Sequence, residues 1–228
     1  AAGDIVLINV VDHAAVDALL ETAGAAVAER LVIGLSSDTP ERAVGTAALA
    51  ERLGGRYLDG AIMTPTITIG TPEASILFAG PRSHFEAASE VLAALGTPTW
   101  LGTGYDRAAA YDMALLDIFW TAVGGFLHAT AVARHHEIAP TELLPHALGI
   151  TAILAPIFTE LAQRVEADRH ADVSAPVASV AASLRHLVVT SREAGVDAGM
   201  LQAFARHVDR AVEAGLGASE ISAIATVI

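Results

Sequence analysis

Cysteine is absent from this sequence of 228 residues, so disulfide bonds and thiolate metal sites are excluded within it. Basic residues are scarce: 13 Lys and Arg stand against 26 Asp and Glu, and the formal net charge is -13 at pH 7. Nucleic acids and anionic membrane surfaces bind clustered positive charge, which this composition does not supply. We therefore expect no nucleic acid and no membrane among the partners.

Long apolar runs and a targeting leader are missing as well. No uninterrupted apolar stretch reaches about 18 residues, the length that a membrane-spanning helix requires. No basic segment followed by an apolar one opens the chain, as a secretion signal would. Aromatic residues make up only 5% of the chain, but 53% of it is hydrophobic, which is enough for a sizeable core. We expect a soluble, tightly packed, cytoplasmic protein.

The first hundred residues alternate short apolar runs with helical patterns, which is typical of an α/β layer with a parallel sheet and crossover helices. We expect strands at residues 5–10, 31–35, 56–62, 75–79 and 97–101. Helices are expected at residues 12–28, 40–53 and 81–95, the second of them capped by Asp38 or Thr39.

After Gly104 the strand patterns stop and helical spacing takes over. Residues 108–134 form one predicted helix, which spans about 40 Å and is long enough to run from one domain into another. Further helices are expected at residues 141–167, 173–193 and 198–214, with a short one after Ser219. The sequence therefore predicts two domains, residues 1–103 and residues 104–228, the second made of the long interdomain helix and an all-helical remainder.

The nine histidines do not form a metal-binding pattern. His135 and His136 are adjacent and point in different directions on a helix, and no histidine pair has the four-residue spacing of a helical zinc site. We expect no metal. A hydrolase also has little support, because neither a cysteine nor a Gly-x-Ser-x-Gly elbow is present. His128 and His186 are more typical of helix packing than of catalysis.

Residues 102–107, Gly-Thr-Gly-Tyr-Asp-Arg, come close to the glycine-rich dinucleotide fingerprint, since they follow a predicted strand and precede a helix. Arg107 occupies the third glycine position, where a side chain would hold helix and strand apart. We interpret this segment as a turn between domains.

Asp112 lies in the middle of a largely apolar stretch, residues 108–120, AAAYDMALLDIFW. Its neighbours on the same face of a helix are Leu115, Leu116, Phe119, Trp120 and Val123. A carboxylate there must find a partner from elsewhere or be protonated with a raised pKa, as acid–base catalysis or cation stabilisation requires. The alternative is an Asp in the first turns that faces solvent and is favoured by the helix dipole. These residues alone leave both interpretations open.

Several segments together resemble a known family. Residues 58–70 (LDGAIMTPTITIG) followed by residues 75–81 (SILFAGP) are similar to the β-hydroxyacid dehydrogenase superfamily, which is 6-phosphogluconate dehydrogenase-like. Within that superfamily, residues 35–40 (LSSDTP), 111–116 (YDMALL) and 125–129 (GFLHA) most resemble NADPH-dependent imine reductases and reductive aminases. The resemblance implies a Rossmann-like domain joined by a long helix to an all-α domain.

The resemblance also implies an activity, which is hydride transfer from NADPH to the carbon of a cyclic imine or iminium ion, with reductive amination as a related reaction. Hydroxyacid dehydrogenases carry Lys and Asn where this chain has Asp112 and Leu116. An ammonium would repel an iminium ion, whereas a carboxylate stabilises it or, when protonated, donates to the nitrogen. Asp112 is therefore the expected catalytic residue.

The other site residues are implied by the resemblance alone. They are Trp120, Ser179 and Val180 for the substrate, and Asn9, Val10, Ser36 and Ser37 for the cofactor. Core packing is the alternative for the first group, and turn and cap chemistry for Ser36 and Ser37. The partner implied by the resemblance is a second copy of the chain, in a homodimer with intertwined helical domains.

The family's glycine-rich turn, which binds the cofactor pyrophosphate, has no counterpart in these residues. Either the chain is part of a longer protein or it is a degenerate relative that does not bind the cofactor, and we favour the first. Two further hypotheses stay open. One is a 3-hydroxyacid dehydrogenase, disfavoured by the missing Lys and Asn, and the other is a non-catalytic oligomerisation module.

Overall fold

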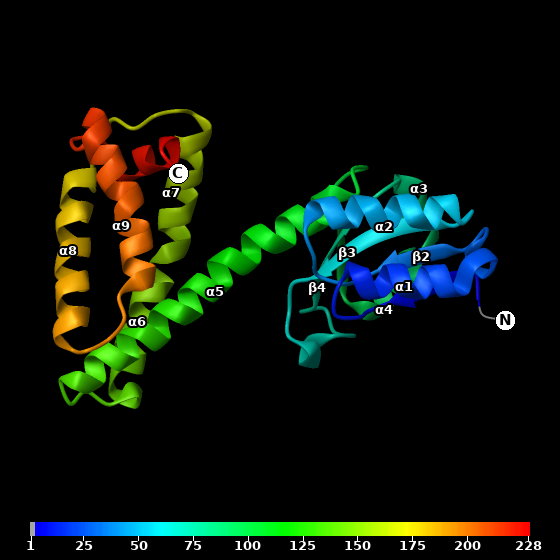
Figure 1. The fold of residues 1–228 in the computed structure, drawn as a ribbon, viewed down its shortest axis with the longest axis horizontal. Coiled ribbons are helices and arrows are strands. Elements are labelled where there is room, and N and C mark those ends of the chain that lie inside the picture. The colour runs from blue at the N-terminus through cyan, green and yellow to red at the C-terminus, as the bar shows by residue number, and fades with distance from the viewer. Residues whose placement is uncertain (1–2) are drawn as a thin grey trace. The chain divides into compact units, whose positions relative to one another are not determined.

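The computed structural model describes residues 3–228 (Figure 1). Ala1 and Ala2, where the first predicted domain starts, lie outside the described residues. Contacts divide the chain into two compact units, one that ends at Thr121 and one that begins at Ala122. This division falls inside α5, Asp106–His135, the long helix predicted for residues 108–134. The predicted domain boundary, near Thr103, precedes this helix.

The first unit contains a sheet of five strands in the order β1-β2-β3-β4-β5. The strands are β1 Ile5–Ile8, β2 Leu31–Gly34, β3 Arg56–Ile62, β4 Ser75–Ala79 and β5 Thr97–Trp100. The expectation of a parallel sheet is wrong at one place, because β3 and β4 pair antiparallel. Their connection holds only a short 3-10 turn, Thr66–Thr68, and no crossover helix, so the chain turns back on itself.

Helices cover both faces of this sheet. They are α1 His13–Ala23, α2 Pro40–Arg52, α3 Arg82–Ala87 and α4 Ser89–Leu95. The side chain of Thr39 caps α2, and Pro40 occupies its first turn. Of the two predicted caps, Asp38 and Thr39, the second is therefore correct. The predicted helix 12–28 ends earlier, at Ala23, and continues as a 3-10 segment, Gly24–Val27.

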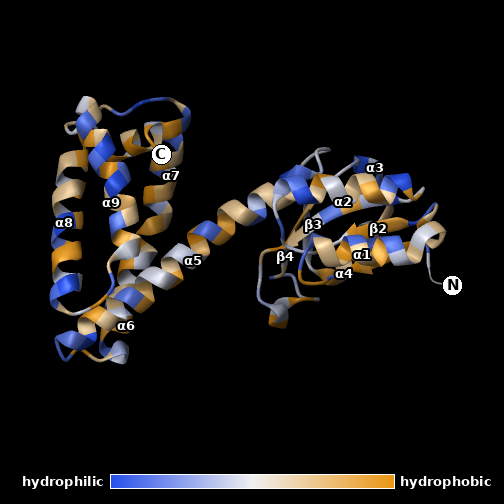
Figure 2. Ribbon diagram, in the orientation of Figure 1, coloured by the Kyte–Doolittle hydropathy of each residue, from blue (hydrophilic) through white to orange (hydrophobic). Residues whose placement is uncertain are grey.

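Two cores form because neighbouring strand residues point to opposite faces of the sheet. On β3, Tyr57 packs with Val16 and Leu20 of α1, whereas Leu58 packs with Phe78 and with Leu92 of α4. In Figure 2 the helices of this unit show hydrophobic and hydrophilic residues mixed along their length, as expected for helices that pack on a sheet with one face. The alternation therefore places Tyr57 and Asp59, two residues apart on β3, on the face that α1 covers.

The second unit is helical. It holds the C-terminal part of α5, then α6 Pro140–Ala152, α7 Leu154–Glu166, α8 Val177–Glu193 and α9 Gly199–Ala211. The helix predicted at 141–167 is broken at Ile153, and the one predicted from Val173 begins four residues later, after Pro176. Glu220 fastens the C-terminal segment to this unit, since its carboxylate accepts hydrogen bonds from the backbone N–H groups of Ser174 and Ala175.

Apolar side chains of several helices remain exposed. Among the residues of α5, only Ala108, Ala109 and Asp112 are buried, and α6 and α7 contain no buried residue. The segments Asp106–His135 and Pro140–Glu166 are long and apolar enough to cross a membrane, by length and composition alone. The apolar face predicted around Asp112 is therefore largely uncovered within the single chain, because only the first turns of α5 pack on the sheet unit.

Candidate active site

Asp112 lies in the second turn of α5 and is buried, with 2% of its surface exposed. The small side chains of Ala108 and Ala109 allow these turns to pack closely against the sheet unit. Burial raises the pKa of Asp112, and a hydrogen bond with the Ser37 side chain opposes this increase. Oxygen Oδ2 of Asp112 has no hydrogen-bond partner among residues 3–228. The interpretation of Asp112 as a solvent-facing residue is therefore wrong.

The segment after β2 reaches this part of α5 through the hydrogen bond between Ser37 and Asp112. Ser36 is buried and its hydroxyl oxygen accepts a hydrogen bond from the backbone N–H of Val10, 3.2 Å away, which ties the two strand ends together. Asn9 and Ser37 are exposed. Open α/β sheets bind ligands at the carboxyl ends of their strands, so amide and hydroxyl groups at this edge are suited to the polar groups of a nucleotide cofactor.

An apolar cavity of about 440 Å³ lies one turn beyond Asp112. It is formed by the segment after β3 and by successive turns of α5, and its lining residues are Ile62, Met63, Thr64, Pro65, Leu115, Leu116 and Phe119. Its volume is in the range of small-molecule sites. The Thr64 hydroxyl is buried and has no hydrogen-bond partner among residues 3–228. The cavity therefore offers a mostly apolar surface.

Trp120, the predicted substrate contact on α5, is 62% exposed. It does not line the cavity, but it packs edge-on against Phe119, which does, with ring centroids 5.1 Å apart. The alternative interpretation of Trp120, core packing, is wrong within the single chain.

The two remaining predicted substrate contacts lie in the second unit, in the first turn of α8. Ser179 is exposed, and Val180 is half-buried against the helical core. His128 lines a separate apolar cavity of about 460 Å³ within this unit, whereas His186 is exposed. Among residues 3–228, no three His, Asp or Glu side chains are grouped as a metal site would require.

A buried polar cluster that was not predicted from the sequence lies near Asp112. Asp59 is 1% exposed, and its oxygen Oδ1 accepts a hydrogen bond from the Tyr57 hydroxyl at 3.4 Å. Nitrogen Nε2 of His13, the first residue of α1, lies 3.6 Å from the same oxygen. The available signal was an Asp among the mostly apolar residues that follow Arg56 in β3, the same kind of signal that marked Asp112 on its helix.

Glycine at position 34 makes room for this cluster. Gly34 ends β2 and is paired with Asp59 in the sheet register. A Cβ atom at position 34 would lie 2.0 Å from the Tyr57 hydroxyl oxygen, so only glycine lets this hydroxyl cross β2. The position of the Tyr57 hydroxyl, and with it the hydrogen bond to Asp59, therefore depends on this glycine.

Burial determines the protonation of the cluster. It raises the pKa of Asp59 to about 8; the hydrogen bond from Tyr57 opposes this increase, and the charge of Asp112 adds to it. Burial also lowers the pKa of His13, although nearby carboxylates, chiefly Asp38, act in the opposite direction. At neutral pH, Asp59 and His13 are therefore both largely uncharged and do not form an ion pair.

A sheet covered by helices, a long helix with a buried carboxyl group, and a helical second unit together define an α/β protein with a candidate small-molecule site at the ends of its strands. The comparisons with known proteins specify the family. The model for the C-terminal domain of NADPH-dependent reductive aminase-like proteins matches residues 105–228. The chain belongs to the NADPH-dependent reductive aminase-like family.

Individual relatives agree with this assignment. A curated NADPH-dependent reductive aminase from Aspergillus oryzae is 25% identical over 227 residues, which cover 98% of this chain and 77% of the relative. A reductive aminase from Aspergillus terreus, solved with NADPH4, cyclohexanone and allyl amine, is 30% identical with a TM-score of 0.92, covering 99% of this chain and 79% of that one. An imine reductase from Myxococcus stipitatus, solved with NADP+, is 27% identical with a TM-score of 0.89, covering 99% and 80%.

Proposed function

We propose that this chain carries the catalytic carboxyl group of an NADPH-dependent imine reductase, which reduces cyclic imines or iminium ions to amines. The observation that carries the proposal is the buried Asp112, hydrogen-bonded to Ser37 at the carboxyl edge of the sheet and one turn from an apolar cavity. The family assignment and the named activities of the relatives support the same reaction.

The chemistry divides between the cofactor and this chain. NADPH supplies the hydride when it is bound. Asn9, Val10 and Ser37 at the strand ends would contact it, and Ser36 would hold the two loops in place through its bond to Val10. Asp112 would stabilise the positive charge of an iminium ion and take part in proton transfer to its nitrogen. The cavity beside α5 would hold the apolar ring of the substrate and exclude water from it.

A 3-hydroxyacid dehydrogenase is the weaker candidate. That reaction needs a cationic group beside an oxygen that becomes an alkoxide, and the buried group here is a carboxyl. The names of the relatives also favour reduction of a C=N bond. A non-catalytic oligomerisation module is disfavoured as well, because a scaffold has no need of an unpaired buried carboxyl oxygen.

We infer that the functional form is a homodimer in which helical units of two chains bury their apolar faces together. The exposed side chains of α5, α6 and α7 support this, since they include Phe119, Trp120, Leu148, Ile150 and Phe158. Uncovered apolar surface of this extent is typical of interfaces. In such a dimer Ser179 and Val180 would reach the substrate from the partner chain. The same interface accounts for the two helices whose composition also suits a membrane, so a membrane is not needed to cover them.

The test is NADPH oxidation with 1-pyrroline or its six-membered homologue, on a protein that contains this chain and binds NADPH, and on its Asp112→Asn variant. Loss of Asp112 should lower kcat/KM by about 100-fold or more, the scale of a general acid–base contribution. Asp117→Asn, an exposed carboxylate on the same helix, is the matched control and should retain activity. Full activity in Asp112→Asn, with NADPH affinity and thermal stability unchanged, would exclude the proposed role.

A further inference from the structure

Arginines gather on one helix pair of the second unit, although the chain as a whole is acidic. Helices α8 and α9 lie side by side and are joined by a short turn, residues 194–198 (Figure 1). The two helices contain four arginines but only two acidic residues, Glu193 and Asp209. This pair of helices is therefore positively charged within a chain whose formal net charge is -13.

A groove of about 380 Å³ lies between these two helices. Three of the four arginines line it, Arg185 and Arg192 from α8 and Arg206 from α9. The aliphatic lining residues are Ala181, Leu184, Val188, Val189 and Ala205. Ala181 and Leu184 are buried and the three arginines are exposed, so the groove has an apolar floor and a cationic rim. Its volume is in the range of small-molecule sites.

The three arginine side chains of the groove have no ion pair and no hydrogen bond to any other group among residues 3–228. Elsewhere in the chain, Arg42, Arg82 and Arg164 each bind a carboxylate at 2.8 or 2.9 Å. Asp209 lines the same groove but forms no ion pair with the arginines. The groove therefore presents guanidinium groups whose hydrogen-bond donors are available to a ligand.

Helix formation does not account for this grouping. A cation in the last turn of a helix is favoured by the helix dipole, which explains Arg192 of α8 and Arg210 of α9. Arg185 and Arg206 lie before the last turns of their helices and gain nothing from that effect. Like charges brought together without a counter-charge repel one another. An anion in the groove would remove this repulsion.

We propose that the groove between α8 and α9 binds a small organic anion, in which one carboxylate is attached to a short unbranched apolar chain. The planar guanidinium group binds a carboxylate through two parallel hydrogen bonds. The apolar floor would bury the chain of the ligand. Asp209 in the lining disfavours a second negative charge, so a carboxylate suits the groove better than a phosphate dianion or a longer polyanion.

The shape of the groove suits an extended ligand. Its lining residues on α8 recur at intervals of three and four from Ala181 to Arg192, and they therefore share one face of the helix. At 1.5 Å per residue, this face is about 16 Å long. The groove lies wholly in the second unit and shares no residue with the cavity beside Asp112. The inference is therefore independent of the proposed reaction.

The test measures binding by isothermal titration calorimetry on the full chain, without NADPH or imine. Octanoate is the probe, and it should bind at one molecule per chain with a Kd of about 1 mM or tighter. Acetate and inorganic phosphate carry charge without the apolar chain and should show no saturable binding in the same range. Octylammonium has the same chain with the opposite charge and should not bind either.

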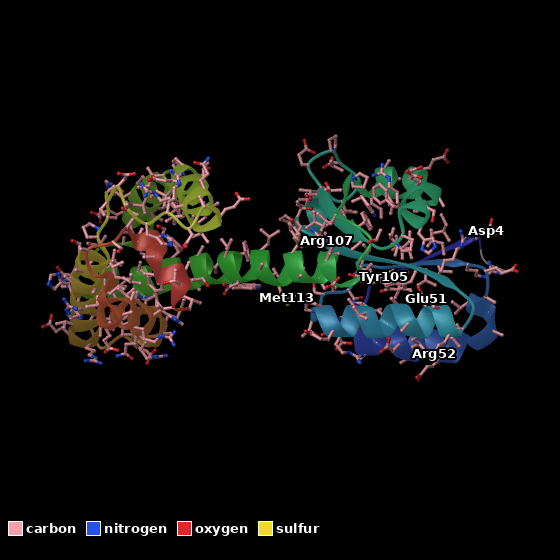
Figure 3. All side chains as sticks on the ribbon, turned by 90° about the horizontal axis from the view of Figure 1, so that it is seen from above. Asp4, Glu51, Arg52, Tyr105, Arg107 and Met113 are labelled. Atoms are coloured by element: carbon pink, nitrogen blue, oxygen red, sulfur yellow. The ribbon has the colours of Figure 1, made fainter. Side chains whose placement is uncertain are left out.

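Arginine variants locate the bound octanoate. Arg206→Gln should weaken binding by about 10-fold or more, the scale of one hydrogen bond to a charged group. Arg206→Lys keeps the charge but loses the planar pair of donors, so its affinity should lie between the two. Arg185→Gln repeats the test on the other helix. Arg52→Gln is the matched control, because Arg52 is an exposed arginine without an ion pair in the sheet unit, labelled in Figure 3.

Several outcomes would overturn the proposal. The absence of saturable octanoate binding would do so, including the case in which a second copy of the chain closes the groove. Phosphate that binds as tightly as octanoate would show a charged surface without an apolar site. Unchanged octanoate affinity in both Arg206→Gln and Arg185→Gln would place the ligand on another apolar surface. None of these measurements depends on imine reduction, so a failure of the proposed function stays distinguishable.

Discussion

At the residue scale, the candidate site depends on carboxyl groups that are buried, where ionising them costs free energy. Asp112 and Asp59 each have apolar residues on both sides in the sequence, and both are buried in the folded chain. Helical spacing gave Asp112 only apolar neighbours, which marked it as a candidate but left burial and exposure to solvent both open. The sequence did not predict that Asp59 lies near Asp112, because the periodicity of a strand does not specify which helix packs beside it.

The hydrogen bond between Ser37 and Asp112 should be visible in the acid limb of the pH profile. This bond lowers the pKa of Asp112, so Ser37→Ala should raise it. The pH at which activity appears on the acid side should then rise by about one unit, the scale of one hydrogen bond to a charged group.

Ser36→Ala is the matched control for that measurement. The Ser36 hydroxyl oxygen accepts a hydrogen bond from the backbone N–H of Val10, so its removal should lower Tm and leave the position of the acid limb in place. Equal shifts of the limb in both variants would contradict the role given to Ser37.

At the scale of elements, the site requires β2, β3 and the N-terminal ends of α1 and α5 to pack closely. Tyr57 is fully buried and crosses Gly34 of β2, while its ring packs 6.0 Å from that of Tyr105 just before α5. The Tyr105 hydroxyl in turn donates a hydrogen bond to Glu51 of α2, and both side chains are labelled in Figure 3. Strand, loop and helix are thus held by a chain of aromatic and polar contacts.

Gly34→Ala tests this packing. The added Cβ atom would lie 2.0 Å from the Tyr57 hydroxyl oxygen and 2.9 Å from the ring, in a site with no free space. The free energy of unfolding, measured with urea, should fall by about 1–3 kcal/mol, the usual cost of overpacking. Combining it with Tyr57→Phe should recover part of that loss.

Gly45→Ala provides the comparison, because this exposed position in α2 has nothing within 4 Å of an added Cβ atom. It should increase the free energy of unfolding by up to about 1 kcal/mol, since alanine favours a helix over glycine. If the two variants proved equally stable, the close approach of Tyr57 to β2 would be wrong.

At the scale of the whole molecule, the exposed apolar helices predict association. The mass in solution at micromolar concentration should be twice that of the single chain measured, which is 23.4 kDa for these 228 residues alone. Ile150, on α6, is 64% exposed, so Ile150→Glu should place a charge in the interface and shift the protein towards single chains. Light scattering after size exclusion measures this mass directly.

Leu19→Glu serves as the control for association. Leu19 is an exposed aliphatic residue on α1, in the sheet unit, and its replacement should leave the dimer intact. A single-chain mass for the unmodified protein would contradict the inferred dimer, and so would a dimer that tolerates Ile150→Glu.

Pattern and tertiary contacts account for different parts of this structure. The five strands, the long helix and the cap at Thr39 followed from local periodicity and turn chemistry, which depend on neighbouring residues. The antiparallel pairing of β3 and β4, the break at Ile153 and the exposure of α5 did not. These features depend on tertiary contacts. The apolar pattern of a helix is the same whether the helix packs against its own chain or against another chain.

The sequence by itself determined the α/β and all-helical parts, the resemblance to the family and the choice of Asp112 as a candidate catalytic residue. These depend on residue types and their spacing along the chain, including Asp112 where hydroxyacid dehydrogenases carry a lysine. Only the tertiary structure decided that Asp112 is buried, that Ser37 hydrogen-bonds to it, and that Asp59, Tyr57 and His13 gather near it. Residues far apart in sequence form such a cluster through the register of β2 with β3 and the passage of Tyr57 over Gly34. Burial within that cluster then changes the acidity of its carboxyl groups, which their sequence positions alone do not encode.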